Sequence, residues 1–219
     1  VYSSIDHMGR YAYGNQPRIA LWNLSGLANA LLPVIADDPE AAVEPATEVI
    51  HSFPERFARA HADGMRRKLG FSEWREADAE LAANLLRRMA EQRADFTLTF
   101  RRLSELEDEA SEADAAVSEL FEVPAAFDEW AVRWRGRLQG EPRWLAERRA
   151  DMRSVNPAFI PRNHRVEEVI AAATTKGDFG PFDTLMDVLA SPYDDQPERD
   201  EYAAPPRPEE VVHETFCGS

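Results

Sequence analysis

The sequence is poor in lysine, cysteine and net positive charge, and each shortage narrows the possible functions. Its 219 residues carry 40 acidic and 25 basic side chains, which gives a formal net charge of −15. A surface of this charge repels phosphate backbones and anionic lipid headgroups, so we expect neither nucleic acid nor a membrane as a partner. We also find no apolar run that approaches the roughly 20 residues of a membrane-spanning helix.

Cysteine occurs once, as Cys217, so an internal disulfide is excluded. One cysteine in a chain of this length is typical of a reducing compartment, and we expect a cytoplasmic protein. Lysine occurs only as Lys68 and Lys176, and the other basic residues are arginines, which pair well with carboxylates. We therefore expect ion pairs on helix surfaces. The chain starts at Val1 without a methionine or a leader pattern, and we expect a fragment or processed piece.

The apolar residues recur at helical spacing nearly throughout, and no segment alternates as a strand would, so we predict a mainly α fold. Residues 17–35 are apolar around almost the whole circumference, which predicts a buried central helix. Pro54, which follows a capping-box pattern at Ser52, predicts a break in the next helix. The expected helices are 17–35, 45–69, 72–89, 96–103, 124–138, 142–155, 163–173 and 182–189, with Ser72 and Asn163 as expected caps.

Two segments have other compositions. Residues 104–119 are the most acidic stretch, and we favour a solvated loop or helix face over a cation or basic-partner site. Residues 191–219 are rich in proline and acids and predict either an extended strap or a disordered end. Three aromatic side chains could anchor a strap and favour that alternative: Tyr193, Tyr202 and Phe216.

The chain contains few residues in patterns typical of catalysis or metal binding. No histidine pair has helical metal-site spacing with a nearby acid, and phosphate-binding glycine loops and a nucleophile elbow are absent. The triplet Asp178-Phe179-Gly180 spells the magnesium motif of kinases. It lies between two expected helices near the carboxy terminus, so we interpret Gly177 as a helix end and Asp178 as a cap.

Two stretches carry a family resemblance: Asp6-His-Met-Gly-Arg-Tyr-Ala-Tyr-Gly-Asn-Gln-Pro17 and Asn156-Pro-Ala-Phe-Ile-Pro-Arg-Asn163. Together they resemble the carboxy-terminal half of selenoprotein O (YdiU)-type protein adenylyltransferases. Further matches follow in the family's order, at Trp22-Asn-Leu24, Ala30-Leu-Leu-Pro33, Lys68-Leu-Gly70 and Pro192-Tyr-Asp-Asp-Gln-Pro197.

The resemblance implies a protein-kinase-like (pseudokinase) fold that uses ATP and Mg²⁺ to transfer AMP to hydroxyl side chains of proteins. It places Val1–Gln16 as an activation segment, 17–190 as the helical carboxy-terminal lobe and 191–219 as the tail. The nucleotide- and metal-binding residues of the family precede Val1, so we expect no catalytic residue and no cofactor in this chain. The expected partners are the missing kinase-like half and protein substrates, in a bacterial cytoplasm.

The resemblance also marks residues that could lie near the active site. Asp6, Arg10 and Tyr11 belong to the activation-segment-like stretch, where they either face the site or only anchor the segment. Cys217 occupies the place of the selenocysteine of animal members. The cysteine that is its implied disulfide partner in some bacterial members is replaced here by Tyr2, which puts that bridge in doubt.

Three hypotheses follow. The chain is the carboxy-terminal part of an adenylyltransferase and is inactive alone, or it is a freestanding helical interaction module with an acidic face. In the third, it is a substrate-docking or regulatory lobe whose tail and Cys217 respond to redox state.

Overall fold

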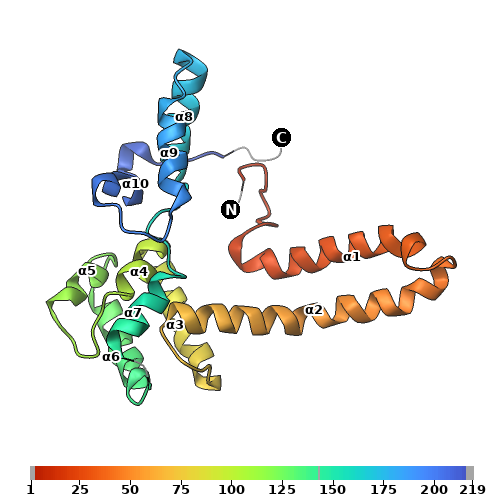
Figure 1. The fold of residues 1–219 in the computed structure, drawn as a ribbon, viewed down its shortest axis with the longest axis horizontal. Helices are drawn as coiled ribbons and strands as arrows, with labels where there is room; N and C mark the ends of the chain where they lie inside the picture. Colours follow the sequence, from red (N-terminus) through yellow and green to blue (C-terminus); the bar gives the residue numbers. More distant parts are fainter. Residues whose placement is uncertain (1–2, 143, 216–219) are drawn as a thin grey trace. The chain divides into compact units, whose positions relative to one another are not determined.

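The structure is a computed structural model that describes residues 3–142 and 144–215, and these residues contain helices but no strand. Its chain divides into two compact units. The first unit comprises the described residues of Val1–His61 and Val212–Ser219, and the second comprises Ala62–Val211. Figure 1 shows the helices of both units along the chain. The mainly α prediction is confirmed for the described residues.

The first unit contains one short 3₁₀ turn and two long helices. The turn η1 spans Tyr13–Asn15, α1 spans Gln16–Ile35, and α2 spans Pro39–Lys68 and contributes residues to both units. α1 and α2 run antiparallel after a turn at residues 36–38 (Figure 1). A hollow of about 140 Å³ between them is lined by small and aliphatic side chains of both helices, such as Ala28, Leu32 and Ala46.

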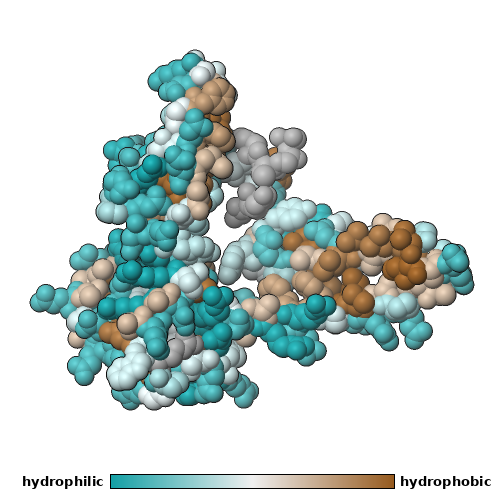
Figure 2. All heavy atoms as spheres, viewed as in Figure 1, coloured by the Kyte–Doolittle hydropathy of each residue, from teal (hydrophilic) through white to brown (hydrophobic). Residues whose placement is uncertain are grey.

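The prediction that α1 is a buried central helix is wrong for this chain. Ile19 is its only buried residue, while Trp22, Leu27 and Val34 are exposed. Figure 2 shows hydrophobic side chains gathered on the visible face of α1. A helix that is apolar on most sides needs packing partners on most sides. Within the described residues of the first unit, α2 supplies such a partner on one side only.

By length and composition, Tyr13–Ile35 could cross a membrane, which corrects the expectation that no such segment exists. It is the one segment of this kind among the described residues, and it lies near the amino terminus. The core helix of a soluble protein has the same length and composition. The segment is therefore weak evidence for a membrane.

The expected break at Pro54 is also wrong, because α2 continues through both Pro45 and Pro54. The Ser52 hydroxyl donates to the carbonyl of Val49 at 2.7 Å and so does not cap a new helix. Proline removes one backbone donor, but the hydrogen bonds of the neighbouring turns remain. The rings of Phe53, Phe57 and His61 follow one another with centroids 6.0 Å apart and hold the turns after Pro54 together.

The second unit builds a closed core from short helices. Its elements are α3 (Glu76–Glu91), α4 (Phe96–Leu103), η2 (Glu112–Asp114), α5 (Ala115–Ser118), α6 (Ala125–Leu138), α7 (Leu145–Arg153), α8 (Asn163–Lys176), α9 (Gly180–Ala190), η3 (Pro197–Arg199), α10 (Asp200–Ala203) and η4 (Pro208–Glu210). The aromatic stripe predicted for α6 is confirmed as core: Phe127, Trp130 and Trp134 are fully buried. The indole N–H groups of Trp130 and Trp134 donate to the carbonyls of Leu81 and Leu69, each at 2.9 Å.

Two predicted caps are wrong. α3 begins after Arg75 rather than after Ser72, because the carboxylate of Asp78 accepts the Arg75 N–H at 2.8 Å and closes the first turn there. The Ser72 N–H instead donates to Glu141 at 2.8 Å. Asn163 is the first residue of α8 and not its cap. The local hydrogen bond between Arg75 and Asp78 thus begins α3, while Glu141 from a distant part of the chain binds the Ser72 N–H.

The interpretation of the kinase-like triplet as a helix boundary is confirmed. Gly177 ends α8 with a φ of 65°, a left-handed conformation that glycine adopts readily. The carboxylate of Asp178 accepts the N–H of Gly180, the first residue of α9, at 2.9 Å. The triplet therefore joins two helices.

The acidic stretch 104–119 is not merely solvated. Glu105 pairs with Arg153, Asp108 pairs with Arg148, and both oxygens of Asp114 accept from Arg135, at 2.7 and 2.8 Å. These pairs attach the stretch to α6 and α7. The tail after residue 190 also contains regular turns (η3, α10 and η4), where the sequence predicted little regular structure.

Candidate functional site

The activation-segment-like stretch is folded as a series of tight turns. The N–H groups of Asp6, Gly9, Ala12 and Asn15 each donate to the carbonyl three residues earlier, at 2.8–3.0 Å. The two oxygens of Asp6 accept the N–H groups of Arg10 and Tyr11, both at 2.8 Å. The Tyr11 N–H contributes most to holding the pKa of the Asp6 carboxyl below its usual value. Asp6 is thus the residue that shapes this stretch.

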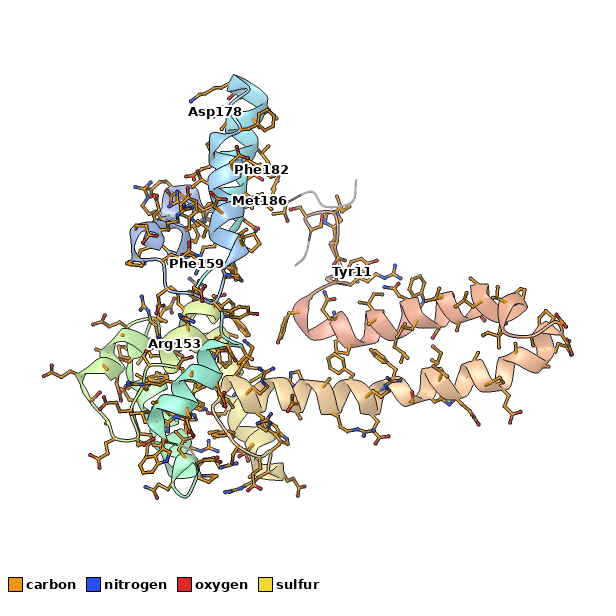
Figure 3. The ribbon with its side chains drawn as sticks, in the orientation of Figure 1. Tyr11, Arg153, Phe159, Asp178, Phe182 and Met186 are labelled. Atoms are coloured by element: carbon orange, nitrogen blue, oxygen red, sulfur yellow. The ribbon has the colours of Figure 1, made fainter. Side chains whose placement is uncertain are left out.

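Arg10 and Tyr11 lie beside the first turns of α1. The Arg10 guanidinium lies 4.4 Å from the centre of the Trp22 ring and 5.7 Å from that of Tyr11, distances typical of cation–π contacts. The Gln16 side chain donates to the Tyr11 carbonyl at 2.5 Å. Figure 3 labels Tyr11 just before α1. The structure therefore brings Asp6, Arg10 and Tyr11 together through these contacts.

The carboxy-terminal tail meets the start of this stretch. The Ser4 N–H and the Ser3 hydroxyl both donate to the Thr215 carbonyl, at 2.7 and 3.1 Å, and the Thr215 N–H donates to the Ser4 hydroxyl at 2.9 Å. Cys217, Phe216 and Tyr2 lie outside the described residues. The described tail thus reaches the chain segment that the resemblance associates with Cys217.

In the second unit, a buried arginine joins two of the family-like motifs. Arg101 of α4 donates to the carbonyls of Asn156 and Tyr193, at 3.1 and 3.0 Å, and to the carboxylate of Asp195 at 2.6 Å. Asp195 also lies 3.3 Å from Arg153. The hydrogen bond from Arg101 is the main cause of the lowered pKa of Asp195. One side chain thereby fixes residues 156 and 193–195, which are far apart in the sequence.

Lys68 and Asn156 form a second link within this cluster. The Lys68 ammonium donates to the side-chain oxygen of Asn156 and to the carbonyl of Val155, at 3.0 and 3.1 Å. The Asn156 amide donates to the Lys68 carbonyl at 3.1 Å and to the Ser104 hydroxyl at 3.2 Å. Burial lowers the pKa of Lys68. Lys68, whose ammonium also lies 5.1 Å from the centre of the Phe100 ring, thereby ties α2 to the Asn156 motif.

The remaining residues of the Asn156–Asn163 motif are held at two points. The N–H groups of Ala158 and Phe159 both donate to the carbonyl of Pro192, at 2.8 and 3.1 Å. Arg162 pairs with Asp95 at 2.7 Å, and Asp95 also caps α4 by accepting the Leu98 N–H at 2.8 Å. Beside Phe159 (Figure 3) lies an open cavity of about 500 Å³. Its walls come from α4, the motif and the tail: Leu98, Arg101, Phe159, Pro197, Ala203 and Pro205.

Sequence reasoning missed Arg101, Arg153 and Asp95 as organising residues. No spacing rule separates the buried Arg101 from its neighbour Arg102, since both follow the apolar residues of α4 directly. The motifs themselves were the available signal, because a buried loop needs hydrogen-bond donors for its carbonyls. Among the described residues, no group of three or more His, Cys, Asp or Glu side chains is placed to hold a metal ion.

Comparison with known proteins identifies relatives across the whole chain. The family described as "Protein adenylyltransferase SelO" matches residues 1–190. The chain is 56% identical over 220 residues to "Protein nucleotidyltransferase YdiU" of Bradyrhizobium sp. (strain ORS 278) and 56% identical over 219 residues to that of Rhodopseudomonas palustris (strain BisB18). It is 53% identical to the protein of the same name of Rhizobium etli (strain CIAT 652). The chain is covered completely by each, and it spans 44% of their length, at their carboxy-terminal end.

Proposed function

Because this chain belongs to the SelO family, whose named relatives are protein nucleotidyltransferases, we propose that it is the carboxy-terminal part of a protein adenylyltransferase. The parent protein would transfer AMP from ATP to hydroxyl side chains of other proteins. The observation that carries this proposal is the match of residues 1–190 to the adenylyltransferase family, with 56% identity to a nucleotidyltransferase over the complete chain.

In this proposal, the chain supports a reaction whose reacting groups lie elsewhere in the parent. ATP and Mg²⁺ would be bound by the kinase-like half, and residues 1–16 would form the activation segment beside that site. The transfer needs positioning and neutralisation of phosphate charge. Structural hydrogen bonds hold each of the family-like stretches in this chain: Asp6 accepts from Arg10 and Tyr11 within its own stretch, and Asn156 accepts from Lys68 and Arg101. These bonds support a positioning role.

The exposed apolar surface of α1 supports a missing partner. A soluble protein rarely leaves a long apolar helix uncovered. α1 carries a single charged residue, Arg18, and exposes Trp22, Leu27 and Val34. We propose that the kinase-like half of the parent covers this surface, so that α1 becomes the central helix of a carboxy-terminal lobe. The isolated chain would then be inactive.

The proposed setting is the bacterial cytoplasm, with no nucleic acid and no membrane as a partner. The relatives named above come from bacteria, and the single cysteine is in accord with a reducing compartment. A net charge of −15 disfavours binding to polyanions.

A labelling experiment tests the activity. The full-length parent and the 219-residue chain are each incubated with Mg²⁺, a bacterial protein extract and ATP labelled with ³²P at either the α- or the γ-phosphate. We expect the parent to transfer the α-label, to lose this activity when EDTA removes Mg²⁺, and to transfer no γ-label. The isolated chain should transfer neither. Transfer of only the γ-label by the parent, or α-labelling by the isolated chain, would contradict the proposal.

A regulatory role of the tail is the second candidate, and the hydrogen bonds between Thr215 and residues Ser3 and Ser4 favour it. These bonds attach the tail to the stretch proposed as the activation segment. If Cys217 acts as a redox switch there, Cys217→Ser should abolish any difference in labelling between the oxidised and the reduced parent. Equal labelling of the oxidised and reduced unmodified parent would exclude the redox role.

A further inference from the structure

The α8–α9 pair exposes apolar side chains that no other described part of the second unit covers. α9 has two apolar faces: Leu185 and Val188 are buried, whereas Phe182 and Met186 are 45% and 52% exposed. Phe179, just before α9, is 61% exposed, and Ile170 of the neighbouring α8 is 47% exposed. Figure 3 labels Phe182 and Met186 along α9, and Figure 2 shows hydrophobic colouring on this helix pair. We call Ile170, Phe179, Phe182 and Met186 the α9 stripe.

Acidic side chains accompany the α9 stripe. Asp183 and Asp187 follow Phe182 and Met186 directly in α9, and both are exposed. Within the described residues neither takes part in an ion pair, whereas Asp108, Asp114 and Asp195 of the same unit are paired with arginines. Lys176 is the one cation in the sequence between residue 166 and the end of α9, and Arg199 from the tail donates to the carbonyl of Thr184 in α9 at 3.2 Å. Apolar side chains beside two carboxylates that form no described ion pair are complementary to an apolar segment flanked by lysine or arginine.

The α9 stripe differs from the exposed surface of α1. α1 holds one charged residue in 20 and exposes apolar side chains along its whole length, which is typical of a permanent interface. The α9 stripe consists of four half-exposed side chains with carboxylates beside them. Small, charged-edged surfaces of this kind are typical of transient interfaces with peptide-like partners.

We propose that the α9 stripe docks a short, basic, amphipathic segment of the protein substrates. The apolar side of that segment would cover Phe182 and Met186, and its lysine or arginine side chains would face Asp183 and Asp187. The partner's identity as a substrate rests on the proposed adenylyltransferase function. The proposed recognition, an apolar contact beside two carboxylates, does not depend on that function.

The test measures peptide binding by the full-length parent. The ligand is a fluorescent synthetic peptide of about five helical turns, with leucines on one face and lysines along its edges, and a counterpart carries glutamates in place of the lysines. We expect the lysine peptide to bind, with an affinity that falls as salt is added, and the glutamate peptide to bind at least about tenfold more weakly, a difference of about 1.4 kcal/mol.

Two double variants and a matched control localise the binding. Phe182→Ser with Met186→Ser should lower the affinity for the lysine peptide by about tenfold or more. Asp183→Lys with Asp187→Lys should shift the preference toward the glutamate peptide. Val132→Ser removes an exposed apolar side chain from α6 and should change neither. Unchanged peptide affinity in both double variants would overturn the proposal.

Measurements of stability and of assembly state distinguish peptide docking from two other ways in which the α9 stripe could be covered. If the rest of the parent covers the stripe, Phe182→Ser with Met186→Ser will lower the parent's melting temperature while Val132→Ser will not, and the proposal fails. If a second copy covers it, the same double variant will convert a dimer to a monomer in sedimentation, and the proposal fails as well. Peptide binding without any α-label transfer would leave the docking surface standing and overturn only the adenylyltransferase function.

Discussion

The two units of this chain differ in how many of their apolar side chains they bury. The second unit buries a continuous core that includes Leu85, Phe100, Trp130 and Trp134, each less than 2% exposed. The first unit has a 20-residue apolar helix of which only Ile19 is buried. The difference lies in the partners: in the second unit short helices approach one another from several directions, whereas α1 is packed on one side by α2.

This difference shows that hydrophobicity alone does not make a core. Burial stabilises by about 25 cal/mol per Å² of apolar surface removed from water, so an apolar helix contributes only where something covers it. We therefore expect substitutions in the second unit to act on the stability of the 219-residue chain. Equivalent substitutions in the first unit should act mainly on the full-length parent.

The largest contrast should come from two tryptophans. Trp134→Ala removes a fully buried ring whose N–H donates to Leu69, and we expect it to lower the free energy of unfolding of the 219-residue chain by about 3–5 kcal/mol. Trp22→Ala removes a ring that is 61% exposed and should change it by less than about 0.5 kcal/mol. Urea unfolding followed by circular dichroism measures both. Equal effects would show that the first unit is as closed as the second.

The buried Arg101 offers the next test. Arg101→Leu leaves the carbonyls of Asn156 and Tyr193 without their donor, and we expect a loss of about 2–4 kcal/mol in the same urea experiment. Arg102→Leu is the matched control, because Arg102 makes one exposed hydrogen bond to Ala116, and it should cost at most about 1 kcal/mol. A similar cost for both variants would contradict the central role given to Arg101.

Substitutions at two glycines compare the packing density of the second unit with that around α1. Gly70 has a φ of 78°, and a Cβ there would lie 2.6 Å from the sulfur of Met152, so Gly70→Ala should destabilise the chain by about 2–3 kcal/mol. In α1 a Cβ at Gly26 meets nothing within 4 Å. Gly26→Ala should instead raise helix stability by about 0.5–1 kcal/mol, visible as greater helicity of the isolated chain. Destabilisation of the isolated chain by Gly26→Ala would mean that this side of α1 is covered.

The smallest effect should appear in the pH dependence. Burial of Asp95 opposes its ionisation, but hydrogen bonds from Arg162 and the Leu98 N–H together hold its pKa below the usual value. Its stabilising contribution is therefore present above the pKa of the unfolded chain and is lost as pH falls through the lower folded pKa. Asp95→Asn should destabilise the chain at neutral pH, and this difference should shrink below about pH 4.

Asp6 of the first unit is the control for this pH experiment. Its carboxylate also accepts two backbone N–H groups, in a residue that is half-buried, but it takes part in no described ion pair. Asp6→Asn should change the urea midpoint of the chain less than Asp95→Asn at every pH. A larger effect of Asp6→Asn would show that the turns before α1 contribute to global stability.

Much of the helical architecture could be predicted from the sequence, because 3.6-residue periodicity reflects burial along each helix. The aromatic stripe of α6, the helix 96–103 and the role of Asp178 follow from local patterns. The continuity of α2 through Pro54 could not be predicted, because the cost of one proline competes with the bonds of a 30-residue helix. For the candidate site, the motifs marked Asp6 and Asn156, but the residues that hold them required spatial information.

The sequence by itself determined the family, the helical class and the places of the motifs, since these depend on residue identity and short-range spacing. Only the tertiary structure decided which motifs meet and which apolar surfaces close. Arg101 binds Asn156, 55 residues later in the chain, and Asp195, 94 residues later, and such pairings leave no periodic trace. Likewise, α1 and α6 both appear as core helices in the sequence. Burial depends on the elements that pack around a helix, and in this chain such elements surround α6 but leave much of α1 exposed.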